Sequence, residues 1–310
     1  MKKFFNKIYI KYFITCGLLV WLFLKFDVGK VFAIISGLSV FVYLMVNFIH
    51  LVSYIFSALK WKIILRKISY IKLLKLYLIG SYYSMVLPGQ IAGEAAKAYI
   101  LGKDDNEAEK VAVSVIIDKI TGIIGLLLLS IAGIFFSKMN LSPKLAYSFS
   151  AAVIICIMLL FSLRISVIYH FFYSITNSLM KHFPKFKASI IFLQNILSSW
   201  QLYIRKTGLM LLCVSMGVGY QLFAVLIYST LASSMGIIIP FADWLWIIGF
   251  LSIILLLPIS IAGIGAREGT LIGILATLGI SSEKAMALSL SILGIQIVWA
   301  IIGALIEIKR

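Results

Sequence analysis

Charged residues are scarce in this sequence, and acidic residues are scarcer still. Charged residues make up 13% of the 310 residues, with 11 Asp and Glu against 28 Lys and Arg, while 62% of the residues are hydrophobic. The mean hydropathy of +1.09 excludes a soluble domain. Because the Lys and Arg residues lie mainly between apolar runs rather than on one soluble basic face, we expect no nucleic-acid partner. The composition predicts an integral membrane protein.

Residues that form disulfides or hold metals are also few. Cys16, Cys156 and Cys213 all lie within apolar spans, so we expect no disulfide framework. The three histidines have no ligand spacing with Cys, Asp or Glu, and we expect no metal site. The sequence lacks a Walker phosphate-binding loop and a dinucleotide-binding glycine fingerprint, and we therefore expect no cofactor.

What the sequence does contain is long apolar runs. A helix of about 20 residues crosses a hydrocarbon core of roughly 30 Å. The runs lack the strict alternation of barrel strands, so the predicted fold class is all-α, a polytopic helical membrane protein. Six runs are long enough for a full crossing, at residues 8–26, 34–59, 111–136, 145–163, 208–233 and 284–308.

Two further runs, at residues 71–101 and 244–279, are broken in the middle. The phrase LPGQIAGE at residues 87–94 interrupts the first, and a similar phrase, LPISIAG at residues 257–263, interrupts the second. Pro and Gly free backbone groups that lipid cannot bond, so such breaks occur where protein or a wet cavity surrounds them. We interpret both runs as re-entrant hairpins. Three crossings separate them, so they enter from opposite faces, as an inverted repeat requires.

Basic residues predict the orientation of the chain. They precede the first run, cluster at residues 60–67 and end the sequence at 309–310, which predicts both termini in the cytoplasm and a place in the cytoplasmic (inner) membrane. Residues 164–206 contain six Lys and Arg, no Asp or Glu, and many aromatics. We expect a cytoplasmic segment of helices on the membrane surface there, the alternative being a solvated loop. We interpret residues 1–310 as a single membrane domain.

Six ionisable residues lie within apolar sequence, where a charge costs roughly 2.5–3.5 kcal/mol at the centre of a helix. They form three close acid and base pairs, namely Glu94 with Lys97, Asp118 with Lys119, and Arg267 with Glu268. The first pair shares a helix face. Members of the other two pairs point about 100° apart and must find partners elsewhere.

Arg267 is the strongest candidate for binding an anion. It follows Gly263 and Gly265, where the second arm of its hairpin should begin, so a guanidinium and free backbone N–H groups converge on one ligand, for which phosphate is the obvious choice. Lys97 stands similarly early in the second arm of the first hairpin. The alternative is that the charges act as structural clamps while the glycines permit close helix packing.

Three blocks, at residues 87–99, 114–122 and 257–269, carry a family likeness in order and spacing. With these blocks the chain resembles the flippase-like membrane proteins related to the transmembrane region of lysylphosphatidylglycerol synthase. It departs from the family at Lys97 and Lys119, where Arg is frequent, and at Ala92, where the family often has a Gly-Gly pair. Lysine keeps the charge but loses the planar two-pronged fork of arginine.

The resemblance implies a lipid flippase or lipid-headgroup transporter that moves an anionic phospholipid or a polyprenyl-phosphate-linked glycan between leaflets. The residues that contact the substrate would be the six ionisable residues above together with Gln90. The soluble aminoacyl-transferase domain of the bifunctional synthases is not in this sequence, so we expect no enzyme activity from this chain alone. The alternative is a membrane subunit or accessory protein that serves a separate synthase or glycosyltransferase. The sequence does not determine the oligomeric state, and a homo-oligomer is one alternative.

Overall fold

The computed structural model describes residues 27–87, 91–105, 108–137, 139, 143–183, 186–257 and 262–310. These residues form α-helices and one short 3-10 helix, with no strand among them, which confirms the all-α prediction for this part of the chain. The predicted crossing at residues 8–26 lies outside the described residues. The elements are α2 (Val28–Ser36), α3 (Val40–Ile64), α4 (Tyr70–Val86), α5 (Ile91–Asp105), α6 (Ala108–Phe136), α7 (Pro143–Phe161), η1 (Ser162–Arg164), α8 (Ser166–His182), α9 (Lys187–Ile204), α10 (Thr207–Ser234), α11 (Phe241–Leu256), α12 (Ala266–Ala276) and α13 (Ser282–Ile308).

Serine side chains begin three of the helices. Ser39, Ser69 and Ser281 have extended backbones, and each hydroxyl oxygen accepts a hydrogen bond from the backbone N–H three residues later. Such a cap satisfies one of the free donors at a helix start. Local sequence therefore determines where α3, α4 and α13 begin.

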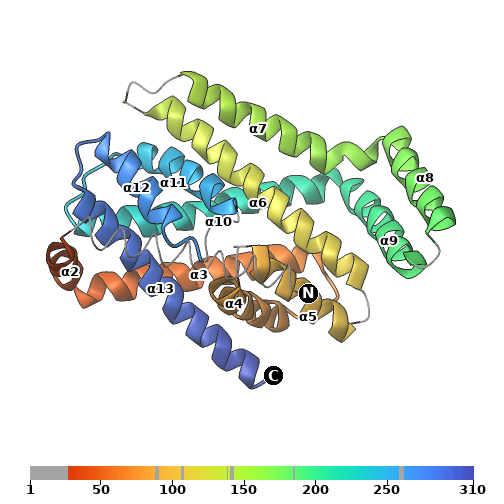
Figure 1. Ribbon diagram of the computed structural model, residues 1–310, viewed down its shortest axis with the longest axis horizontal. Coiled ribbons are helices and arrows are strands. Elements are labelled where there is room, and N and C mark those ends of the chain that lie inside the picture. The colour runs from red at the N-terminus through yellow and green to blue at the C-terminus, as the bar shows by residue number, and fades with distance from the viewer. Residues whose placement is uncertain are drawn as a thin grey trace.

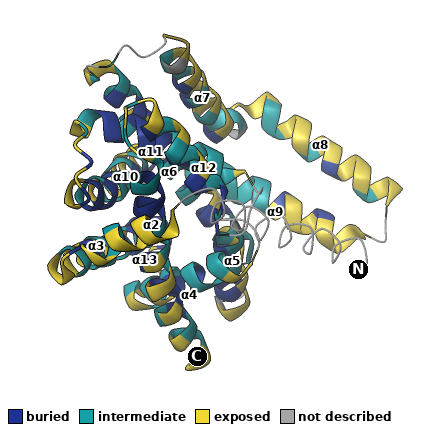
Figure 2. Ribbon diagram, turned by 60° about the vertical axis from the view of Figure 1, so that its left-hand side comes forward, coloured by how far each residue is buried: buried dark blue, intermediate teal, exposed yellow. Residues whose placement is uncertain are grey.

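Four helices, α3, α6, α10 and α13, are long and apolar enough to cross a membrane by length and composition. The predicted crossing at residues 145–163 coincides with α7, which together with α8 makes a fifth candidate if the two form one span bent by 67°. Helix α8 belongs to the segment we expected on the membrane surface, and it is largely exposed where it projects with α9 from one end of the bundle (Figures 1 and 2).

The two broken runs fold as pairs of packed helices, α4 with α5 and α11 with α12 (Figure 1). The start of α4 meets the end of α5, where Lys72 Nζ lies 3.6 Å from Asp104 Oδ2. The same Asp104 binds Arg310 at the end of α13, with 2.7 Å between Nη2 and Oδ1. At its other end, α13 contributes Lys284, whose Nζ donates to the Gly236 carbonyl oxygen, 3.1 Å away, between α10 and α11. The two helix pairs therefore begin at opposite ends of the bundle.

Glycines allow the central helices to approach closely. A Cβ added at Gly303 of α13 would overlap the Leu78 carbonyl oxygen of α4. A Cβ at Gly125 of α6 would come within 2.5 Å of the Gly217 backbone of α10. Small residues at such crossings let helices gain packing contacts where lipid supplies no hydrophobic driving force.

We expect Gly303→Ala to destabilise the protein, because the new methyl group forces α13 away from α4. Overpacking of this kind costs about 1–3 kcal/mol, so the melting temperature in detergent should fall. Gly294→Ala on the same helix is the matched control, since a Cβ there meets no atom within 4 Å. Equal melting temperatures for the two variants would contradict the close packing of α4 and α13.

Candidate functional site

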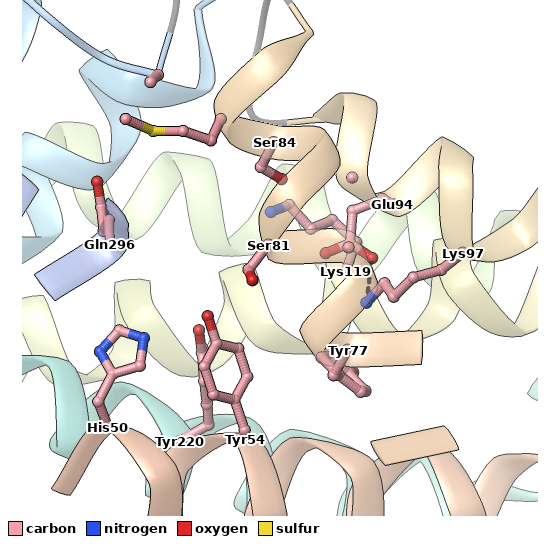
Figure 3. A pocket seen from close by; sticks show the side chains of 14 residues that line it. His50, Tyr54, Tyr77, Ser81, Ser84, Glu94, Lys97, Lys119, Tyr220 and Gln296 are labelled. Carbon is pink, nitrogen blue, oxygen red and sulfur yellow. Dashed lines mark ion pairs between the residues drawn. The ribbon is translucent and has the colours of Figure 1, made fainter. Parts of the chain in front are cut away.

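A cavity of about 240 Å³ lies where the inner ends of the two helix pairs meet (Figure 3). Ser84 and Met85 near the end of α4, Gly93 near the start of α5, and Ala262 just before α12 all line it. Helices α3, α6, α10 and α13 contribute the other walls. Both broken runs, distant in sequence, thus contribute to one space.

One side of the cavity carries charge. Lys97 is only 2% exposed, and its Nζ lies 2.7 Å from Glu94 Oε2, as the spacing of the two residues predicts. The same Nζ lies 3.6 Å from the centre of the Tyr77 ring, a cation–π contact. Lys119 of α6 also lines the cavity, and no described residue forms an ion pair with it. The structure therefore brings together three of the predicted site residues, Glu94, Lys97 and Lys119.

Asp118 lies behind this wall and pairs with Lys60 of α3. Lys60 Nζ lies 3.1 Å from Asp118 Oδ1 and donates to the Asp118 carbonyl oxygen at 2.7 Å. The Tyr77 hydroxyl donates to Asp118 Oδ2 at 2.7 Å. Tyr77 thus touches both ion pairs, with its ring against Lys97 and its hydroxyl on Asp118. Nothing in the sequence identifies Lys60 as the partner of Asp118, because Lys60 stands in the basic cluster at residues 60–67.

Arg267 and Glu268 are 1% and 0% exposed and do not line the cavity. The Arg267 guanidinium donates to Gln296 Oε1 at 2.9 Å and to the Ala262 carbonyl oxygen at 3.2 Å. Both acceptor residues do line the cavity, so Arg267 stands directly behind its wall. In this arrangement Arg267 holds the wall in place rather than reaching into the space.

Glu268 fixes the start of α12. Its Oε2 accepts a hydrogen bond from the Gly265 backbone N–H at 2.5 Å, and its Oε1 accepts one from the Ser289 hydroxyl of α13 at 2.6 Å. Gly265 has a φ of 85°, which glycine adopts without strain. Gln90, the remaining predicted site residue, lies outside the described residues.

The rest of the cavity wall is polar and aromatic. His50 and Tyr54 of α3, Ser81 of α4, Tyr220 of α10 and Gln296 of α13 face the space (Figure 3). The His50 ring stacks on Trp299 with 5.8 Å between ring centres, which holds it at this wall. A single polar residue in an apolar run is the only sequence signal for His50 or Gln296. The tyrosines give no such signal, because they are common throughout the chain.

The cavity has the charge and the hydrogen-bonding groups to bind a polar anion. Glu94 compensates Lys97, and Lys119 contributes a further positive charge, while hydroxyl and amide groups offer hydrogen bonds around it. Within the described part of the chain, no group of three His, Cys, Asp or Glu residues could hold a metal ion.

The chain matches a known protein family. The model of the lysylphosphatidylglycerol synthase TM region matches residues 8–303, nearly the whole chain, including every wall of the cavity. No curated protein and no solved structure matches the chain.

We expect the Lys60 and Asp118 pair to show strong coupling in a double-mutant cycle. Lys60→Met or Asp118→Asn alone leaves a buried partner uncompensated, which costs about 3–5 kcal/mol, so the double variant should lose less stability than the two single variants added together. Thermal unfolding in detergent measures all four proteins.

The exposed pair formed by Lys30 and Asp27 is the matched control, since its side chains are 71% and 50% exposed. Its coupling should be about 0–1 kcal/mol. Additive losses for the Lys60 and Asp118 variants would show that this ion pair does not hold α3 to α6.

Proposed function

This chain belongs to the lysylphosphatidylglycerol synthase TM-region family, and from that premise we propose that it is a lipid flippase or lipid-headgroup transporter. Its substrate would be an anionic phospholipid or a polyprenyl-phosphate-linked glycan. The observation that carries the proposal is the charged cavity at the meeting point of two broken helix pairs. Transport sites in membrane proteins are commonly built from such half-helices near the middle of the bilayer.

In the proposed mechanism, Lys119 receives the headgroup phosphate first. Lys119 lines the cavity without an ion-pair partner among the described residues, whereas the Lys97 ammonium is already 2.7 Å from Glu94. An arriving phosphate would compete with Glu94 for Lys97, which weakens one contact within α5 and favours movement of that helix pair. The hydroxyls of Ser81, Tyr54 and Tyr220 would bind the polar headgroup, while the hydrophobic chains stay in lipid.

Arg267 takes a different part in this mechanism from the one its sequence position predicts. It positions Gln296 and the backbone before α12, through hydrogen bonds of 2.9 and 3.2 Å. Loss of its side chain would leave Glu268 without its basic neighbour inside the protein. Arg267→Ala is therefore a poor test of phosphate binding, because it confounds binding with folding.

The relation of the helix pairs supports an inverted repeat. Helix α4 packs on α13, and α11 packs on α6, so each pair's first helix lies against the long helix that follows the other pair. The pairs also begin at opposite ends of the bundle. We propose that α4 with α5 and α11 with α12 enter the bilayer from opposite faces and open in turn.

Cations at one end of the bundle support a cytoplasmic placement of that end in the inner membrane. Arg66, Lys67, Lys110 and Lys206 line a cavity there, and Lys72, Lys75, Lys309 and Arg310 line another together with one acid, Asp104. The described charges at the opposite end are mixed in sign, namely Asp27, Lys30, Lys144, Asp243, Glu283 and Lys284.

We expect Lys119→Gln to slow exchange of fluorescent anionic lipids between the leaflets of proteoliposomes. A hydrogen bond to a charged group contributes about 1.5–3 kcal/mol, so the loss should be roughly tenfold to hundredfold. Lys144→Gln is the matched control, because it removes the same charge from an exposed position at the start of α7.

If the wild type exchanges lipid and both variants do so at the same rate, Lys119 is not part of the transport site. If the folded wild type moves no lipid of either class, the flippase proposal fails. Activity that appears only after a synthase or glycosyltransferase is added would favour the accessory role instead.

We expect the two ends of one helix pair to lie on the same side of the membrane, and the ends of the other pair to lie on the opposite side. Single cysteines placed at these ends test this arrangement. In a background without native cysteines, Ile71→Cys and Lys103→Cys should react with an impermeant thiol reagent from the cytoplasmic side. Ile238→Cys and Thr277→Cys should react from the other side. All four positions are exposed. Labelling of Ile71→Cys and Lys103→Cys from different sides would mean that α4 and α5 together cross the membrane once, as one broken span, and the inverted repeat would be wrong.

A further inference from the structure

A second basic cavity lies outside the candidate transport site. It has a volume of about 280 Å³ and is enclosed by the end of α3 with the loop that follows, the start of α6, the end of α9 and the start of α10. Its charged lining consists of Arg66, Lys67, Lys110 and Lys206, and none of the described lining residues is acidic. The four cations come from three separate segments of sequence, so only the fold brings them together.

The loop that carries Arg66 and Lys67 is held in one conformation. Lys62 Nζ donates to the Arg66 carbonyl oxygen at 2.5 Å and to the Ile68 carbonyl oxygen at 2.6 Å. The ammonium thereby ties the end of α3 to the start of α4. Because the backbone of this loop is fixed, a ligand that binds Arg66 and Lys67 would not incur the entropic cost of ordering the loop.

The electrostatics of this cavity favour an anion. Lys110 stands in the first turn of α6 and Lys206 at the cap of α10. The start of a helix carries partial positive charge, so both cations are at positions that the helix itself disfavours. A bound anion would be attracted by both helix starts and by all four side chains.

The walls beneath the cations are apolar. Ile63, Ile64, Leu65, Leu202 and Leu209 line the same cavity, and the Leu202 side chain is 64% exposed. The cavity lies where the apolar run of α3 ends and that of α10 begins, so it would stand near the lipid headgroups when both helices span the bilayer. Its volume is slightly below the roughly 300–1,000 Å³ of small-molecule sites, which suits a headgroup with its chains outside.

We propose that this cavity binds a phosphate-bearing headgroup of an anionic phospholipid from the adjoining leaflet, as a site separate from the central cavity. The lipid would join α3, α6, α9 and α10 at the base of the projecting α8 and α9. Its phosphate would lie among Arg66, Lys67 and Lys206, and its hydrocarbon chains would leave the cavity past the exposed Leu202 side chain. The proposal does not require that the protein transports lipid.

The test is titration of phosphatidylglycerol into the full-length protein in neutral detergent, with the melting temperature as readout. Phosphatidylcholine serves as a zwitterionic lipid and inorganic phosphate as a free anion. The variant Arg66→Gln/Lys67→Gln/Lys206→Gln should bind phosphatidylglycerol about a hundredfold more weakly, because each cation near an anionic surface contributes roughly fivefold. Lys30→Gln/Lys103→Gln/Lys144→Gln removes the same charge at exposed positions outside this cavity and should keep wild-type affinity.

Weaker binding by the charge variant could also come from loss of folding. Ser199→Phe separates the two causes, because it fills the cavity without changing any charge. It should weaken the phosphatidylglycerol effect while leaving the melting temperature without lipid unchanged. Stabilisation by inorganic phosphate as strong as that by phosphatidylglycerol would overturn the lipid source and leave a free-phosphate site. If both triple variants lose the same affinity for phosphatidylglycerol, or if Ser199→Phe loses none, the cavity is not the binding site.

Discussion

Ionised side chains inside the bundle must be compensated by other side chains, because lipid cannot solvate them, and the rest of the structure depends on this constraint. Lys60 and Asp118 join α3 to α6 through an ion pair of 3.1 Å, and Tyr77 of α4 adds a hydrogen bond to the same carboxylate. The other side of Tyr77 contacts Lys97 of α5. One network therefore holds four helices in register and keeps a polar space beside them.

The second half of the molecule meets the same constraint with different geometry. Arg267 and Glu268 are fully enclosed and bind groups of α13 and of the backbone before α12. In the first half, the pair formed by Glu94 and Lys97 faces the cavity instead. Two acid and base pairs that look equivalent in sequence thus have different surroundings. One pair lines the cavity, and the other lies behind the cavity wall.

The all-α class and the long helices were predictable because membrane helices leave strong signals. Apolar runs located α3, α6, α10 and α13, and the Pro and Gly phrases located the breaks between α4 and α5 and between α11 and α12. The site was predictable only in part. Charges in apolar sequence identified Glu94, Lys97 and Lys119, but His50, Tyr54 and Tyr220 resemble ordinary packing residues until the helices are assembled. Lys60 stood in a basic cluster typical of a cytoplasmic loop, although its side chain is 5% exposed.

The sequence by itself determined a helical membrane protein of this family with two broken helix pairs, because hydropathy, backbone chemistry and the three blocks at residues 87–99, 114–122 and 257–269 are all local properties of the chain. The tertiary structure decided which charges meet. Partners such as Lys60 and Asp118, or Arg267 and Gln296, are separated by tens of residues, and their pairing depends on which helices cross and at what rotation. It also decided that Lys119 faces the cavity while Arg267 stands behind the cavity wall. The direction in which each side chain points depends on how its helix is rotated against its neighbours, and the local sequence does not specify that rotation.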